Sequence, residues 1–173
     1  GLKKPHFYRI NLFIFEFYIK SMNVAIIGFG YWGPNLARNF SSVADCKVKY
    51  VCDYRAERLA VVRKQYSSVI LTNDFETVLN DSEIDAVVIA TPVFTHFDLA
   101  KKALLKGKNV LIEKPMTSTS AEAIELYELS KKMEKLLMVD HTFLYTGAVQ
   151  KMKQLITEGT VGNIKYLDST RIN

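Results

Sequence analysis

A glycine-rich turn that follows an apolar run constrains the fold of this chain more than any other feature. The apolar residues 24–27 lead into the sequence GFGYWG at Gly28–Gly33, and a helix-type sequence follows at 34–40. Glycines at the first, third and sixth positions of a strand–turn–helix unit predict a turn that binds the pyrophosphate of a dinucleotide. They allow the tight turn, the approach of the phosphates and the packing of helix on strand. The helix then directs its free N–H groups at the phosphates.

An acidic residue at the end of a second apolar run supports this interpretation. Asp53 lies 20 positions after Gly33 and directly follows residues 48–52. A carboxylate at this spacing accepts hydrogen bonds from the adenosine ribose, and its charge repels the 2′-phosphate of NADP. We therefore expect NAD to bind in preference to NADP. Arg55 and Arg58 complicate this expectation, since an arginine can bind that phosphate. A glycine triplet alone also fits an ordinary βα turn, whereas the strand, helix and acid together favour nucleotide binding.

Short apolar runs alternate with helical patterns along most of the chain. The predicted strands lie at 24–27, 48–52, 69–71, 86–90, 110–112 and 136–139, and the predicted helices at 36–40, 56–65, 75–79, 97–105 and 121–133. This alternation predicts an α/β fold of the Rossmann type, a doubly wound parallel sheet with helices on both faces. Ligands then bind at the carboxyl ends of the strands, where Gly28, Asp53, the Thr91-Pro92 pair and the Glu113-Lys114-Pro115 triplet all lie.

Composition narrows the functional classes. The net charge is +5, but the lysines are spread over predicted helices and their ends, which indicates solvated helix faces and no nucleic-acid partner. These lysines are Lys101, Lys102, Lys106, Lys108, Lys131, Lys132 and Lys135. The two cysteines, Cys46 and Cys52, have no metal-ligand spacing, so neither a metal site nor a disulfide framework is expected, and a cytoplasmic location fits.

The two ends of the chain differ from its middle. Residues 1–21 are crowded with aromatic side chains before the first predicted strand, and we interpret them as an upstream or non-native extension, with no membrane span. A packed extra strand or a membrane-surface anchor is the alternative for this segment. Residues 22–142 form the predicted nucleotide-binding domain. Residues 143–173 contain a predicted helix at 145–158, stopped by Gly159, and a strand-like run at 163–172. We expect this part to be a linker helix and the first strand of a truncated α+β substrate domain.

Three motifs together resemble the glucose-fructose oxidoreductase/inositol dehydrogenase-like (Gfo/Idh/MocA) family. They are the Gly28–Gly33 turn, the segment 91–96 with the sequence TPVFTH, and the Glu113-Lys114-Pro115 triplet; the later DHTF sequence at 140–143 is similar as well. The triplet is the most specific of them. The resemblance implies that Lys114 lies beside the nicotinamide and the substrate as the catalytic residue, and that a cis bond can precede Pro115. An ammonium group there stabilises oxyanion character on the substrate oxygen or takes part in proton transfer.

The resemblance also implies the cofactor-binding set. It comprises Gly28, Phe29, Gly30, Tyr31, Trp32, Gly33, Asp53, Tyr54, Arg55, Thr91, Pro92, His96, Glu113 and Lys114. His96 belongs to it as a residue on the nicotinamide side, although a histidine at a helix start is more often a cap or a packed side chain. His141 either borders the active site or is a structural histidine at a domain junction.

The function that follows is an NAD(P)-dependent oxidoreductase that transfers hydride between the cofactor and a secondary alcohol of a sugar, an inositol or a nucleotide sugar. Its remaining acid/base residues would lie beyond Asn173, and the full-length protein is expected to be a homo-oligomer. The alternative is a non-catalytic nucleotide-sensing or scaffold protein that kept the fold. A methyltransferase-like Rossmann domain predicts no Glu-Lys-Pro triplet and is disfavoured.

Overall fold

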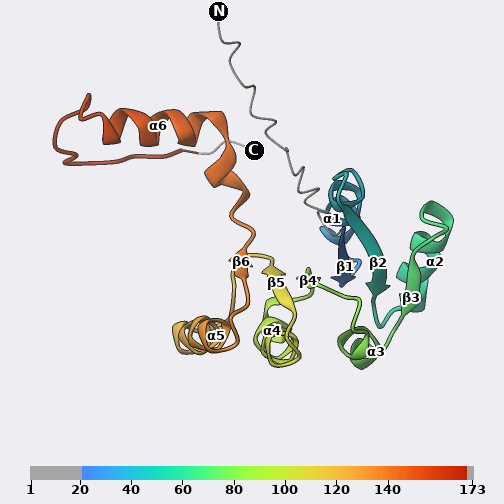
Figure 1. Ribbon diagram of the computed structural model, residues 1–173. Helices are drawn as coiled ribbons and strands as arrows, with labels where there is room; N and C mark the ends of the chain where they lie inside the picture. Colours follow the sequence, from blue (N-terminus) through green and yellow to red (C-terminus); the bar gives the residue numbers. More distant parts are fainter. Residues whose placement is uncertain (1–20, 171–173) are drawn as a thin grey trace, which may run out of the picture.

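The computed structural model describes residues 21–170, and it contains a six-stranded parallel sheet flanked by helices (Figure 1). The strand order is β3-β2-β1-β4-β5-β6, so the chain reverses its direction of winding between β1 and β4. The strands are β1 (Met22–Ile27), β2 (Cys46–Cys52), β3 (Ile70–Thr72), β4 (Ala86–Ile89), β5 (Asn109–Ile112) and β6 (Leu137–Val139). This order and the parallel pairing confirm the predicted Rossmann-type doubly wound sheet.

Five helices cover the two faces of the sheet. They are α1 (Gly33–Ser41), α2 (Ala56–Gln65), α3 (Phe75–Asn80), α4 (His96–Leu105) and α5 (Ser120–Lys132). Successive strand residues face opposite sides, so Val24 and Ile26 of β1 pack with Leu36 of α1, while Ala25 and Ile27 belong to the core on the α3, α4 and α5 side. Because both faces are covered, the strands are continuous apolar runs. That property made them visible in the sequence, with bounds that differ by a few residues at most.

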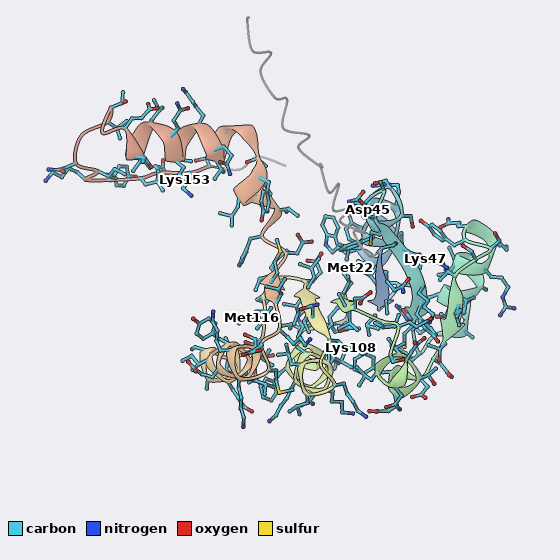
Figure 2. The ribbon with its side chains drawn as sticks, viewed as in Figure 1. Met22, Asp45, Lys47, Lys108, Met116 and Lys153 are labelled. Carbon is cyan, nitrogen blue, oxygen red and sulfur yellow. The ribbon has the colours of Figure 1, made fainter. Side chains whose placement is uncertain are left out.

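The first strand is tied to the loop before its neighbour. The N–H of Met22 donates to the carbonyl of Asp45 at 2.8 Å, and the two residues lie close together (Figure 2). The segment 1–21, interpreted as an extension, falls almost entirely outside the described residues. Within the described part, no helix has the length and apolar character needed to cross a bilayer.

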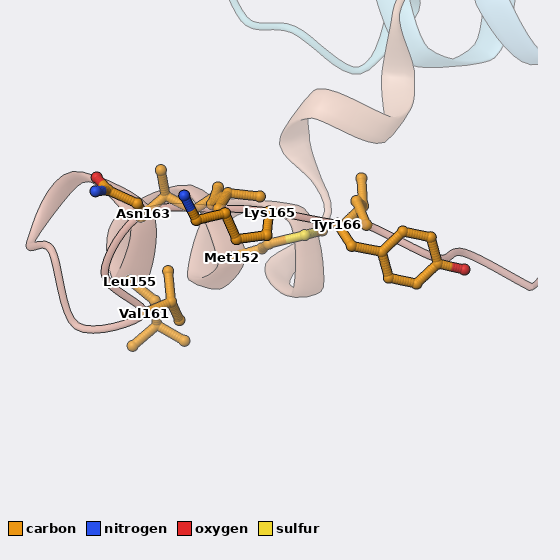
Figure 3. Close-up of a pocket in the computed structure, with 9 residues that line it drawn as sticks. Met152, Leu155, Val161, Asn163, Lys165 and Tyr166 are labelled. Atoms are coloured by element: carbon orange, nitrogen blue, oxygen red, sulfur yellow. The ribbon is translucent and has the colours of Figure 1, made fainter.

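Helix α6 (Gly147–Thr157) stands away from the sheet (Figure 1). It follows the short 3-10 helix η2 (Thr142–Tyr145) and ends as predicted at Gly159, whose φ of +71° is the left-handed conformation that closes a helix. None of its residues is buried. A shallow apolar groove of about 430 Å³ lies between α6 and the segment 161–167, which doubles back along it (Figure 3).

The predicted strand at 163–172 is wrong over the part that the structure describes. Residues 163–170 form no strand. A strand exists through hydrogen bonds to a neighbouring strand, and no described segment pairs with this one. The alternating side chains alone therefore did not determine its conformation.

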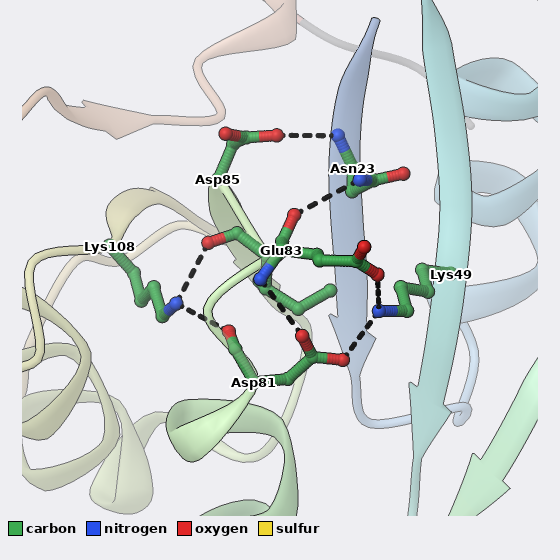
Figure 4. A network of polar contacts seen from close by, with 7 residues as sticks. Asn23, Lys49, Asp81, Glu83, Asp85 and Lys108 are labelled. Carbon is green, nitrogen blue, oxygen red and sulfur yellow. Dashed lines mark hydrogen bonds and ion pairs between the residues drawn. The ribbon is translucent and has the colours of Figure 1, made fainter.

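One lysine also departs from its prediction. Lys108 is only 6% exposed, and its ammonium group donates to the carbonyls of Asp81 at 2.7 Å and Ile84 at 2.9 Å (Figure 4). Burial lowers the pKa of Lys108. In the same network, Lys49 pairs with Asp81 at 2.6 Å. Lys108 is thus a structural residue that joins the start of β5 to the loop before β4, and not part of a solvated face.

Candidate functional site

The glycine turn leaves β1 in a conformation that requires glycine at its first position. Gly28 has a φ of +92°, and a Cβ there would lie 2.8 Å from both the Ala90 carbonyl oxygen and Thr91 Cγ2. Its N–H donates to the carbonyl of Cys52 at 2.8 Å. Gly30 is different, because a Cβ at that position would meet only Arg55 Nη2, at 3.7 Å. Gly28 is therefore needed by the fold, while the space above Gly30 is open except for the Arg55 side chain.

Asp53 holds this turn in place from the end of β2. Its Oδ2 accepts from the N–H of Phe29 at 2.7 Å, and its Oδ1 accepts from the N–H of Arg55 at 2.9 Å. The Arg55 guanidinium donates to the same carboxylate from Nε and Nη2, both at 3.1 Å. Burial opposes the charge, but the hydrogen bonds from Arg55 and Phe29 outweigh it and lower the pKa of Asp53. The carboxylate is ionised and already makes four hydrogen bonds.

A cavity of about 430 Å³ opens at the switch point between β1 and β4. It brings together Gly28, Asp53, Tyr54, Thr91 and Pro92, all predicted from the sequence. The cavity is also lined by residues that sequence reasoning did not assign to the site, namely Ile27, Cys52, Asn73, Phe75, Phe94, Thr95 and Leu99. Phe94 and Thr95 belong to the TPVFTH segment, whereas Asn73, Phe75 and Leu99 belong to no motif and had no local signal. The cavity is the place where the sheet topology predicts a nucleotide.

A second cavity, of about 920 Å³, lies on the other side of the glycine turn. Its wall includes Trp32 at the start of α1, Lys114 and Pro115 after β5, and Asp140 and His141 after β6. The peptide bond between Lys114 and Pro115 is cis. The position of His141 favours the border of a site over a purely structural role. Asp140 begins the DHTF sequence that resembles the family, but sequence reasoning assigned it no role in the site.

Glu113 directly precedes Lys114, which lines this second cavity. Glu113 is 8% exposed, and its N–H donates to the carbonyl of Ile89 at 2.9 Å. Burial is the main reason that the pKa of Glu113 is raised, and the charge of Asp140 adds to it. The two acids come from neighbouring strands, because β5 pairs with β6 up to Ile112 and Val139.

His96 connects the two cavities without reaching into either of them. The side chain is 1% exposed, with Nε2 at 2.8 Å from the carbonyl oxygen of Thr91 and Nδ1 at 3.0 Å from that of Pro115. Both ring nitrogens are thus engaged by the backbone. His96 fixes the loops that follow β4 and β5 relative to each other, which supports the packed interpretation over direct contact with a cofactor.

The remaining predicted residues lie around the turn. Tyr31 and Tyr54 are exposed, and Tyr31 meets Trp32 edge to face with ring centroids 5.5 Å apart. Phe29 is buried in the core beside α1. Its side chain anchors the turn, so only its backbone can face a ligand. Among residues 21–170, no three His, Cys, Asp or Glu side chains are grouped to hold a metal ion.

The fold and these two cavities define a Rossmann-type nucleotide-binding protein. The chain belongs to the Gfo/Idh/MocA oxidoreductase family: the family model described as "Oxidoreductase family, NAD-binding Rossmann fold" matches residues 22–141. It is similar to the uncharacterized oxidoreductase YdgJ of Escherichia coli K12, with 31% identity over 151 residues, 86% of this chain and 42% of that protein. The chain therefore spans less than half the length of this relative.

Solved structures agree with this assignment. An NAD-binding protein from Listeria innocua superposes with a TM-score of 0.76 at 30% identity, over 83% of this chain and 42% of the other. The scyllo-inositol dehydrogenase of Lactobacillus casei, in a structure with NAD(H) and scyllo-inositol, gives a TM-score of 0.77 over 83% of this chain and 43% of the other. Its identity is 23%, so it shows the fold alone.

Proposed function

We propose that this chain is the nucleotide-binding part of an NAD(P)-dependent oxidoreductase that acts on a secondary alcohol of a sugar, an inositol or a nucleotide sugar. The observation that carries the proposal is the pair of cavities on either side of one glycine turn, with Asp53 at one cavity and Lys114 at the other. A dinucleotide has two ends joined by a pyrophosphate. The turn at Gly28–Gly33 suits the pyrophosphate, and the Asp53 cavity suits the adenosine. The Lys114 cavity suits the nicotinamide and the substrate.

The residues of the turn fit such a cofactor. The open space above Gly30 admits phosphate oxygens, and α1 begins at Gly33 with no side-chain cap on its first N–H groups. Free N–H groups and the positive end of the helix dipole favour an anion there. When bound, the cofactor supplies the acceptor or donor of the hydride. Trp32, on the wall of the Lys114 cavity, provides an aromatic surface beside the turn.

Lys114 is the residue proposed to carry the chemistry in this chain. Its side chain is exposed on the cavity wall next to Asp140 and His141. Its ammonium group can hold the substrate oxygen and stabilise negative charge that develops on it, or exchange a proton with it. A sugar-type substrate is what the resemblance of the Glu113-Lys114-Pro115 triplet to the motif of this family implies. The same proposal includes three further expectations for the complete protein. It contains the rest of the active site, it forms a homo-oligomer, and it is located in the cytoplasm.

Calorimetric titration with NAD and with NADP tests the nucleotide site. We expect NAD to bind more tightly, because the carboxylate of Asp53 repels a 2′-phosphate. Arg55 must leave Asp53 before ribose hydroxyl groups can reach its oxygens, since the four hydrogen bonds already fill them. Tighter binding of NADP would instead show that Arg55 serves the phosphate. Absence of binding for both would contradict the function.

A further inference from the structure

Arg55 lies between the acid at the end of β2 and the open space above the glycine turn. Its Nε and Nη2 both donate to the Asp53 carboxylate at 3.1 Å. The same Nη2 is 3.7 Å from the position that a Cβ on Gly30 would take. An arginine has five N–H donors in all, so this contact leaves the others unused by the carboxylate. The guanidinium group therefore already borders the space that the proposed function gives to phosphate.

The glycine turn depends on a neighbour of this kind for positive charge. Its own sequence, GFGYWG, includes no cationic side chain. The free N–H groups and the dipole of α1 provide only partial charges, whereas a pyrophosphate carries a full negative charge on each phosphate. A guanidinium group binds phosphate through two parallel N–H groups, in the same geometry as it binds a carboxylate. Arg55 can therefore bind a phosphate in the way that it binds Asp53.

Asp53 stays hydrogen-bonded when the guanidinium group leaves it. The carboxylate keeps the backbone N–H groups of Phe29 at 2.7 Å and of Arg55 itself at 2.9 Å. The side chain of Arg55 is 31% exposed, compared with 2% for Asp53, so the arginine can turn away without disturbing the core. The positions that it leaves on the carboxylate oxygens can then accept ribose hydroxyl groups.

We propose that Arg55 exchanges the Asp53 carboxylate for the pyrophosphate when the dinucleotide binds. The inference rests on the proposed function, which places the pyrophosphate at the turn and the adenosine ribose at Asp53. The ribose hydroxyl groups donate to the oxygens that the guanidinium group leaves, while the guanidinium group donates to phosphate oxygens above Gly30. The exchange couples the two parts of the nucleotide site, because adenosine alone must displace Arg55 without offering it a phosphate.

Titrations with NAD⁺, ADP and adenosine test the exchange, because NAD⁺ and ADP contain a pyrophosphate and adenosine does not. Arg55→Ala should weaken the binding of NAD⁺ and ADP by about 10- to 100-fold, the effect of losing hydrogen bonds to a charged group. The same substitution should strengthen the binding of adenosine, because its ribose no longer competes with the guanidinium group for Asp53. Calorimetry measures the first two ligands, and NMR titration measures the third. Unchanged binding of NAD⁺ by Arg55→Ala, or binding of adenosine that does not become stronger, would overturn the exchange.

Arg63→Ala is the matched control, because it removes the same charge from an exposed site on α2 and should keep all three affinities. Arg55→Lys keeps a positive charge beside Asp53 but has no fork for two phosphate oxygens, so its affinity for NAD⁺ should lie between those of the wild type and Arg55→Ala. Thermal unfolding shows whether each variant is folded. If Arg55→Ala does not fold, Arg55→Lys carries the test, and an affinity for NAD⁺ equal to that of the wild type then overturns the exchange. Failure of the wild-type chain to bind any of the three ligands would overturn the proposed function itself.

Discussion

At the scale of single residues, Gly28 and Gly30 have separate tasks although they belong to one motif. A side chain at Gly28 collides with the backbone of Ala90, so it disturbs the fold. At Gly30 the nearest protein atom to an added Cβ is Arg55 Nη2, at 3.7 Å, which is an ordinary van der Waals distance. We therefore expect the backbone turn to accommodate a side chain at Gly30. The same side chain would block the pyrophosphate of a dinucleotide.

Gly30→Val should accordingly abolish dinucleotide binding with little change in stability. The branched side chain fills the space where the pyrophosphate must approach the backbone. Calorimetry with NAD gives the binding, and thermal unfolding gives the stability. Gly147→Val is the matched control, since a Cβ there has nothing within 4 Å, and it should leave both measurements unchanged. A Gly30→Val protein that binds NAD like the wild type would show that the turn does not contact phosphate.

Asp53 should make the stability of the chain depend on pH in the acid range. Its pKa is lower in the folded protein than in the unfolded chain, so its stabilising contribution is present above the unfolded value of about 3.9 and is lost as the pH falls through the folded value. Asp53→Asn weakens the hydrogen bonds to Phe29 and Arg55 and should cost about 1–3 kcal/mol at neutral pH. Denaturant unfolding of both proteins across this range should show the difference shrinking on acidification. A stability difference between the two proteins that does not change with pH would refute the lowered pKa of Asp53.

At the scale of helices and strands, α4 and α6 differ in what they contribute to stability. Leu104 of α4 is fully buried in the core against the sheet, whereas Ile156 of α6 is 42% exposed. Leu104→Ala should therefore cost about 2–5 kcal/mol, the usual range for a buried leucine. Ile156→Ala should change stability by no more than about 0.5 kcal/mol. Chemical denaturation measures both, and a comparable loss for Ile156→Ala would mean that its face is covered in solution.

The contrast between buried and exposed elements also explains which features of the fold the sequence could predict. The strands of the sheet were visible because each is buried on both faces, and the strand–turn–helix at Gly28–Gly33 is a local signal. The closeness of Glu113 and Asp140 was not visible, because β5 and β6 lie side by side only through the crossover that contains α5. The burial of Lys108 likewise arises from the carbonyls of Asp81 and Ile84, more than 20 positions earlier in the chain. Local patterns thus predicted the elements and the glycine turn, and tertiary contacts determined the rest of the site.

At the scale of the whole molecule, the two cavities differ in how complete they are. The adenosine cavity is enclosed by elements of the sheet and its loops, from β1, β2 and β4 to the start of α4. The Lys114 cavity is bordered by Phe143, Leu144 and Val149, which belong to η2 and α6. These elements stand away from the sheet and have no buried side chain. The part of the Lys114 cavity that η2 and α6 form is therefore not supported by the core around the sheet.

We therefore predict that this 173-residue chain binds dinucleotide but does not turn over substrate. Binding needs only the glycine turn, Asp53 and the strand ends at Thr91 and Glu113. Hydride transfer also needs a substrate held about 3–3.5 Å from the nicotinamide, and such positioning can supply about 7–11 kcal/mol of the barrier reduction. In a complete protein that contains this chain, Lys114→Ala should lower kcat by about 10²-fold or more while NAD affinity changes little. Absorbance of reduced cofactor with a panel of sugars and inositols measures turnover. Reduction of NAD by the 173-residue chain would show that Lys114 and its neighbours form a self-contained active site.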